Sequence, residues 1–216
     1  MKKDLTELVF IIDRSGSMSG LESDTIGGYN AMLEKQKKEQ GEEIITTVLF
    51  DDKYELLHDR INIRGVEPIT EKDYFVRGCT ALLDAVGHTI NKIGRVQKHT
   101  ADSERAERVM FVITTDGMEN ASREFTPEKI REMITHQKVK YGWEFIFLGA
   151  NIDSAETAES FGIGRDMAAD YNADSEGTRL NYEVISQTVS DIRARRPISK
   201  EWKERIEEDR EKRGER

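Results

Sequence analysis

Apolar residues gather in short continuous runs that alternate with longer segments of helical periodicity. The runs cover residues 8–12, 44–50, 109–114 and 145–148. Strands covered on both faces of a parallel sheet show continuous runs of this kind, whereas half-exposed strands alternate apolar and polar residues. The pattern therefore predicts an α/β fold in which helices wrap a parallel sheet.

One junction breaks the alternation of strands and helices. The segment VLFDDKYELLHD, residues 48–59, joins two strand-like pieces through Asp51, Asp52 and Lys53 alone. Three residues are too few for the crossover that parallel neighbours require. We therefore expect a hairpin with an antiparallel edge strand, and we interpret Asp51 and Asp52 as its turn.

The segments between the runs carry helical stripes and capping residues. Apolar stripes predict helices around residues 82–93, 130–134 and 180–192, and Thr126 followed by proline is typical of a helix start. A further helix is expected between Asp153 and Gly162. The pair Gly27-Gly28 interrupts a helical stretch, which indicates close packing or a local kink.

The last residues differ in composition from the rest of the chain. After Pro197 the sequence reads ISKEWKERIEEDREKRGER, in which Trp202 and Ile206 are the only large apolar residues after Ile198. We expect one domain over residues 1–197 and a charged helical tail over residues 198–216. An apolar face this thin can offset little of the entropy lost on ordering. We therefore favour a solvated, partly frayed tail over a partner-binding helix that docks through Trp202.

Composition limits the classes of partner and the compartment. The 216 residues include 42 acidic and 33 basic side chains, for a formal charge of -9. This excess of negative charge opposes binding to phosphate backbones, so we expect no nucleic-acid partner. No run approaches the roughly 20 residues that span a bilayer, and the single cysteine excludes an internal disulfide. We expect a cytoplasmic protein without a membrane partner.

The segment FIIDRSGSMSG, residues 10–20, is the most distinctive candidate site. A phosphate-binding P-loop would end in Gly-Lys-Ser/Thr, and this segment has no lysine. A serine-hydrolase elbow would place serine in the middle of Gly-x-Ser-x-Gly, where this chain has Met18. We therefore expect neither of these chemistries.

Oxygen-bearing side chains at several strand ends indicate a metal site instead. Asp13, Ser15 and Ser17 follow the first run, Asp116 follows the run at 109–114, and Thr80 precedes a predicted helix. Carboxylate and hydroxyl oxygens are hard ligands that suit Mg²⁺ or Mn²⁺. Open α/β sheets bind ligands at the carboxyl ends of their strands, so these five residues are our predicted metal ligands.

The motifs DRSGS (13–17), GCTAL (78–82) and TTDG (114–117) resemble the metal-ion-dependent adhesion site (MIDAS) of von Willebrand factor A (vWA) domains. The resemblance covers roughly residues 5–195 and implies a doubly wound, Rossmann-like sheet with one antiparallel edge strand. It also implies a divalent cation, usually Mg²⁺. Ser15, Ser17 and Thr80 would offer hydroxyls to the cation, while Asp13 and Asp116 would act directly or through water.

The same resemblance implies a protein-binding module and not an enzyme. The site of this family leaves one coordination position for an Asp or Glu of a partner protein, and neutral hydroxyl ligands leave the cation attractive to that carboxylate. Stand-alone intracellular members occur in bacteria and phages. Some are linked to AAA+ ATPases or to stress systems such as tellurite resistance, so a partner of that kind is expected.

Two other hypotheses stay open at this stage. Asp13 could be the nucleophile of a Mg²⁺-dependent phosphohydrolase, although Ser15 replaces the second aspartate that such enzymes use as acid and base. Alternatively, the metal site could be structural while the tail binds the partner. Among neighbouring residues, we expect Cys79 to be buried, the four histidines to lie on the surface, and Glu119 and Asn120 to line the rim of the site.

Overall fold

The structure, a computed structural model, describes residues 1–214 and is an α/β fold built on one six-stranded sheet. The strand order is β3-β2-β1-β4-β5-β6, and every neighbouring pair is parallel except β2 and β3. The strands are β1 (Lys2–Asp13), β2 (Glu42–Phe50), β3 (Tyr54–Asn62), β4 (Ala106–Thr115), β5 (Glu144–Gly149) and β6 (Ala168–Asp170). The predicted fold class and the antiparallel edge hairpin are therefore confirmed.

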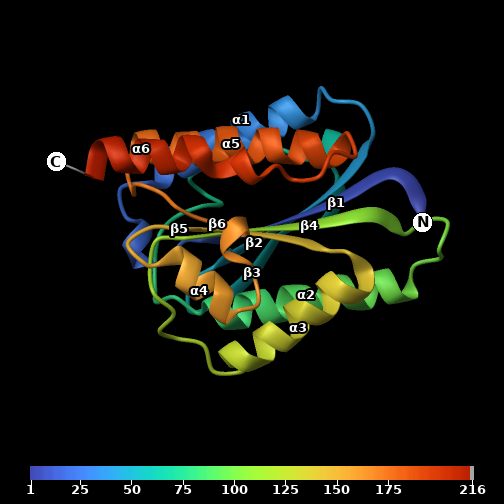
Figure 1. Ribbon diagram of the computed structural model, residues 1–216, viewed down its shortest axis with the longest axis horizontal. Coiled ribbons are helices and arrows are strands. Elements are labelled where there is room, and N and C mark those ends of the chain that lie inside the picture. Colours follow the sequence, from blue (N-terminus) through green and yellow to red (C-terminus); the bar gives the residue numbers. More distant parts are fainter. Residues whose placement is uncertain (215–216) are drawn as a thin grey trace.

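Helices cover both faces of the sheet (Figure 1). The helices are α1 (Glu22–Gln36), α2 (Leu82–His99), α3 (Pro127–Tyr141), α4 (Ser154–Ser160), α5 (Ser175–Arg193) and α6 (Glu204–Gly214). One core lies between the sheet and the layer of α1, α5 and α6, and a second lies between the sheet and α2, α3 and α4. Within residues 1–214, no helix combines the length and apolar character needed to cross a membrane.

The continuous apolar run of β1 supplies both cores at once. Leu8, Phe10 and Ile12 pack in the core under α1 and α5, whereas Val9 and Ile11 pack in the core against α2. Successive side chains of a strand point to opposite faces, so a strand buried on both sides must be apolar at every position. This geometry places the end of β1, and the polar residues that follow it, at the centre of the sheet edge.

Capping residues begin the helices where the sequence predicted them. The Thr126 hydroxyl accepts a hydrogen bond from the backbone N–H of Lys129 at the start of α3, and the Asp153 carboxylate accepts one from Glu156 N–H at the start of α4. Side-chain acceptors at these positions satisfy N–H groups that have no partner inside the helix. The short strand β6 was not predicted, because three residues are too few to produce a recognisable apolar run.

The expectation of a solvated tail is wrong for residues 198–214. Trp202 and Ile206 are buried in the core beneath α5, and the Trp202 indole N–H donates a hydrogen bond of 2.8 Å to the backbone carbonyl of Asp166. The Arg210 guanidinium also pairs with Asp170 of β6. Two large apolar side chains on one face were therefore enough to dock the segment. The last two residues of the predicted tail, 215 and 216, lie outside the described residues.

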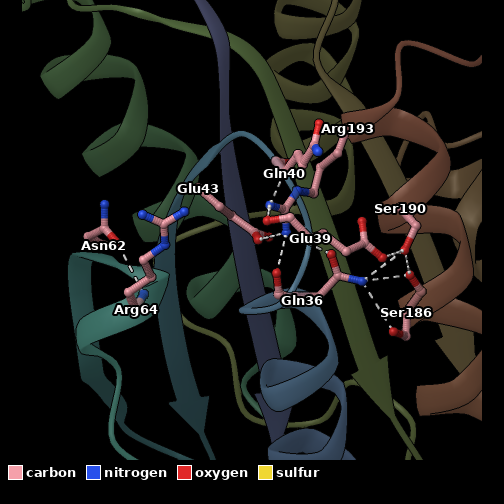
Figure 2. Close-up of polar contacts among 9 residues, drawn as sticks. All are labelled: Gln36, Glu39, Gln40, Glu43, Asn62, Arg64, Ser186, Ser190 and Arg193. Atoms are coloured by element: carbon pink, nitrogen blue, oxygen red, sulfur yellow. Dashed lines mark hydrogen bonds and ion pairs between the residues drawn. The ribbon is translucent and has the colours of Figure 1, made fainter.

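A buried polar cluster joins α5 to α1 and to the start of β2 (Figure 2). Arg193 Nη1 donates to the backbone carbonyl and to Oε1 of Gln36, each over 2.9 Å, and it forms an ion pair with Glu43 at 2.5 Å. Gln36 Nε2 donates to the backbone carbonyl of Ser186 over 2.8 Å. These bonds fix the C-terminal half of α5 against its neighbours by directional contacts as well as by apolar packing.

Candidate metal centre

The candidate site lies where the winding of the sheet changes direction. From β1 the chain reaches β2 through α1 on one face, and from β3 it reaches β4 through α2 on the other. The carboxyl ends of β1 and β4 therefore flank the topological switch point, where open α/β sheets bind ligands. Ile12 pairs with Thr114 in the ladder, so Asp13 and Thr115 follow side by side at the edge.

The loop after β1 folds around the carboxylate of Asp13. The backbone N–H of Ser15 donates to Asp13 Oδ1 over 2.6 Å, and the hydroxyls of Ser15 and Ser17 are hydrogen-bonded at 3.0 Å. Tyr74 donates from its hydroxyl to the backbone carbonyl of Asp13 over 2.7 Å. Asp13 and Ser15 are buried while Ser17 is exposed, so Ser17 is the one of these three residues that solvent reaches.

Thr80 is brought to this loop from a distant part of the chain. Its hydroxyl donates to Ser15 Oγ over 3.0 Å, and the backbone N–H of Gly16 donates to Gly78 O over 3.2 Å. Asn120 holds the other side of Thr80, accepting from its N–H through Oδ1 at 2.9 Å and donating to its carbonyl at 3.0 Å. Asn120 thus supports Thr80 by two backbone contacts.

Glu119 accepts hydrogen bonds at the start of α2 and in its own loop. Its carboxylate accepts hydrogen bonds from the backbone N–H groups of Leu83, Ala121 and Ser122. A carboxylate at a helix N-terminus is stabilised by the free N–H groups there and by the helix dipole. Glu119 therefore anchors the loop after β4 to the start of α2.

Asp116, the fifth predicted metal ligand, directly follows β4. It is buried, and its Oδ1 has no hydrogen-bond partner among the residues that the structure describes. The next residue, Gly117, packs so closely that an added Cβ would lie 2.9 Å from Ser17 Oγ and 3.4 Å from Thr80 Oγ1. All five predicted ligands therefore come from three loops that meet at one edge of the sheet.

The two carboxylates of the site are destabilised in their charged forms. The pKa of Asp13 is raised to about 6, because burial outweighs the lowering by hydrogen bonds from Thr115 and Ser15 and the charge of Asp116 adds to the increase. Burial also raises the pKa of Asp116, and the Ser17 hydroxyl opposes this shift. A divalent cation would relieve both effects, because it favours the ionised carboxylates and provides a partner for Asp116 Oδ1.

The residues present therefore fit a hard divalent cation. Two carboxylates and three hydroxyls supply oxygen ligands only, and such ligands suit Mg²⁺ and Mn²⁺. No group of three or more His, Cys, Asp or Glu side chains is arranged to hold a metal within the described part of the chain. A site rich in hydroxyls is accordingly the candidate metal centre.

Several supporting residues were not identified from the sequence. The Thr115 hydroxyl donates to Asp13 Oδ2 over 2.6 Å, and its position immediately before Asp116 was the only available signal. Arg14 is fully buried and pairs through Nε with Asp51 Oδ2 at 3.0 Å, so Asp51 does more than form the hairpin turn. Two minor expectations were wrong, since Cys79 is exposed and His58 is buried.

Comparison with known proteins identifies the fold. No family model and no curated protein sequence matches the chain. Among solved structures, the vWF domain of the pilus tip protein Mfa5 from Porphyromonas gingivalis matches over 86% of this chain and 95% of that chain, with 11% identity and a TM-score of 0.59. A von Willebrand factor type A structure from Catenulispora acidiphila matches over 85% and 42%, with 11% identity and a TM-score of 0.57.

A third match carries a metal. Proximal thread matrix protein 1 from the mussel byssus, with a zinc-occupied MIDAS motif, matches over 85% of this chain at 14% identity and a TM-score of 0.58. The chain spans less than half the length of the mussel structures, 46% and 45% in two crystal forms. At these identities the likeness establishes architecture and nothing finer: the chain has the fold of a von Willebrand factor A domain.

Proposed function

We propose that this protein is a divalent-cation-dependent module that binds an acidic side chain of a partner protein. Asp13, Ser15, Ser17, Thr80 and Asp116 would hold the cation, with Mg²⁺ as the resident ion and Mn²⁺ as the alternative. The observation that carries the proposal is the convergence of these oxygens around a buried Asp116 carboxylate whose Oδ1 is unpaired. The mussel structure with a zinc-occupied MIDAS motif supports the same site type.

The arrangement of the loop favours recognition of a carboxylate. A bound Mg²⁺ would supply positive charge on a protein whose formal charge is -9. Three neutral hydroxyls leave much of that charge uncompensated, and Ser17 is the ligand exposed to solvent. Met118, two residues after Asp116, is 73% exposed and offers an apolar contact beside the site. The partner segment would therefore present an Asp or Glu next to apolar residues.

The contacts of Asp13 argue against the phosphohydrolase hypothesis. Its Oδ1 accepts a hydrogen bond from Ser15 N–H and its Oδ2 accepts one from Thr115, each over 2.6 Å. Each oxygen of the would-be nucleophile thus accepts a hydrogen bond that lowers its nucleophilicity, while a lone pair is left on each for a cation. We propose a non-catalytic role, with the chain acting in the cytoplasm on a protein partner such as an AAA+ ATPase or stress-system component.

Thermal unfolding in EDTA and in millimolar Mg²⁺ tests the metal site. A ligand that binds only the folded state raises its stability by about 2.7 kcal/mol at a concentration of 100 times Kd. We expect a Mg²⁺-dependent rise in Tm for the wild type, none for Asp13→Ala or Asp13→Asn, and an unchanged rise for Glu71→Ala, which removes an exposed acid elsewhere. An equal rise in the Asp13 variants would refute the proposal.

Partner capture tests the second half of the proposal. Immobilised wild-type protein should retain a partner in Mg²⁺ and release it in EDTA, and immobilised Asp13→Ala should retain none. A double variant, Arg205→Ala with Lys212→Ala, controls for binding through the exposed face of the C-terminal segment and leaves the buried Trp202 in place. A partner that survives EDTA and Asp13→Ala but is lost in this double variant would assign binding to the segment and not to the metal.

A further inference from the structure

A second candidate site lies at the opposite end of the sheet from the metal centre. A groove of about 800 Å³ is bounded by the C-terminal halves of α2 and α3, the start of β4 and Trp143 before β5. Figure 1 shows these two helices together on the face of the sheet away from α1 and α5. Sites for small ligands in proteins typically measure 300–1,000 Å³, so the groove has the right size for one.

The charge of this groove is opposite to that of the protein as a whole. Arg95, Lys98, Arg105 and Lys140 line it, and Glu107 is the one acidic residue among its lining. Glu107 is already engaged, because it accepts hydrogen bonds from the Asp4 backbone N–H and from Arg195. The chain carries 42 acidic and 33 basic residues, so an excess of cations in one concave region is a local departure from its composition.

Three of these cations have no anionic partner among the residues that the structure describes. Among residues 1–214, no ion pair or hydrogen bond joins the side chain of Arg95, Lys98 or Lys140 to another residue, although Arg105 pairs with Asp102 at 3.0 Å. Basic residues in the last turn of a helix are favoured by its dipole, which accounts for Lys98 and Lys140. Arg95 lies one turn earlier on α2, and the dipole does not account for it.

We propose that this groove binds a small polyphosphate ligand, with its phosphates on Arg95, Lys98 and Lys140. Guanidinium and ammonium groups are the side chains that bind phosphate oxygens most strongly. An extended acidic peptide fits less well, because peptides commonly add to a free sheet edge and the strands here, β4 and β5, are internal. Tyr141, which is 52% exposed and lines the groove, offers a ring on which a nucleotide base can stack.

Calorimetric titration with ATP and with inorganic tripolyphosphate tests this site. Both titrations are made in EDTA, so that the metal centre cannot contribute phosphate binding. We expect binding of both probes that weakens as salt is added. Tighter binding of ATP than of tripolyphosphate, lost in Tyr141→Ser, would identify a nucleotide as the ligand, and equal binding would identify inorganic polyphosphate.

Two matched double variants distinguish the effect of the groove on ligand binding from the effect of the overall charge of the protein. Arg95→Glu with Lys98→Glu should weaken binding by about tenfold or more, since it converts attraction to repulsion. Lys35→Glu with Lys38→Glu makes the same charge change on two exposed residues, one in the last turn of α1 and one just after it, and should weaken binding by less than about twofold. Circular dichroism and the Tm would establish that both variants are folded.

Three results would overturn the proposal. These are absence of binding of either probe by the wild type at millimolar concentration, equal losses in the two double variants, and binding of an oligo-glutamate peptide in preference to both phosphates. None of them bears on the metal centre, which uses different residues at the other end of the strands. Equally, loss of the Mg²⁺ response in Asp13→Ala should leave the titrations in EDTA unchanged.

Discussion

The Thr80 hydroxyl donates a hydrogen bond to Ser15 Oγ over 3.0 Å, although 65 positions separate the two residues in the chain. Ser15 is in turn hydrogen-bonded to Ser17 at 3.0 Å, so three hydroxyls form one connected row. Each hydroxyl can both donate and accept, and the row keeps its oxygens oriented without any charged group. The loops after β1 and before α2 therefore hold the candidate ligands in position.

Removal of the Thr80 hydroxyl should weaken cation binding while leaving the fold intact. Thr80→Val keeps the shape of the side chain and removes the oxygen, so we expect Mg²⁺ affinity to fall by about tenfold or more, with a loss of about 1 kcal/mol from the lost hydrogen bond. Thr80→Ser keeps the hydroxyl and should retain most of the affinity. Tm measured over a Mg²⁺ titration distinguishes the two. Equal responses in both variants would show that Thr80 is not a ligand.

Gly117 should be needed for the approach of Asp116 to the other ligands. In Gly117→Ala the new methyl group would lie 2.9 Å from Ser17 Oγ, closer than real contacts allow, so the Ser17 hydroxyl must move from its position in the site. We expect a weakened Mg²⁺ response with little loss of stability in EDTA. Gly27→Ala is the control, because nothing lies within 4 Å of its added carbon, and alanine in a helix should stabilise by up to about 1 kcal/mol.

Arg14 should stabilise the fold more than its neighbour Arg77 does. Both guanidinium groups contact Asp51 Oδ2, but the Arg14 side chain is fully buried while that of Arg77 is 38% exposed. Arg14→Met would leave the buried Asp51 with one cationic partner, Arg77, and we expect the free energy of unfolding to fall by about 3 kcal/mol. Arg77→Met should cost about 1 kcal/mol or less. Urea unfolding measures both values, and equal losses would contradict this assignment.

Trp202 should anchor the C-terminal segment to the domain. Its ring is buried in the core and its N–H is satisfied by the Asp166 carbonyl, so Trp202→Ala leaves a cavity and should cost about 3 kcal/mol. Lys212→Ala, on the exposed side of α6, should change stability by less than about 0.5 kcal/mol. The measurement is urea unfolding of the full chain. A small loss for Trp202→Ala would mean that α6 is not an integral part of the fold.

The strands could be predicted from local sequence patterns, and so could the edge of the sheet at which the candidate ligands lie. The four continuous runs and the hairpin junction located five of the six strands, and parallel strands share one carboxyl edge, which brings Asp13 and Asp116 together. The close packing expected at Gly27-Gly28 holds for Gly28 alone, where an added Cβ would lie 2.3 Å from Tyr182 of α5. That contact joins two helices far apart in sequence, and the dipeptide does not reveal which glycine makes it.

The structural roles of Trp202, His58 and Thr115 were not predicted, because they depend on contacts with residues far away in the sequence. Trp202 is buried because α5 and β6 create a surface for it, and no pattern in the last residues encodes that surface. His58 is buried because Thr47 and Tyr29 provide hydrogen-bonding partners across β2 and α1. Thr115 binds Asp13 because of the register between β1 and β4, which the individual strands do not specify.

The burial of Glu43, which lies beside Arg193, should make stability depend on pH (Figure 2). Burial raises the pKa of Glu43 from 4.5 to about 7, although the Arg193 guanidinium lowers it. Between these two values the folded state holds more protons on Glu43 than the unfolded state does. The free energy of unfolding contributed by this residue therefore decreases as pH rises through this window, and the loss is complete above about pH 7.

Glu43→Gln should remove this slope, since glutamine does not titrate. The difference in unfolding free energy between wild type and Glu43→Gln should change by on the order of 2 kcal/mol between about pH 5 and pH 7.5, at the expense of the wild type. Glu42→Gln, an exposed neighbour paired with Lys2, should show no such change. Urea unfolding in EDTA at several pH values measures the slopes. Comparison of variants is necessary because the raised pKa of Asp13 adds a slope of the same sign to every one of them. Parallel slopes for wild type and Glu43→Gln would mean that Arg193 keeps Glu43 ionised throughout this range.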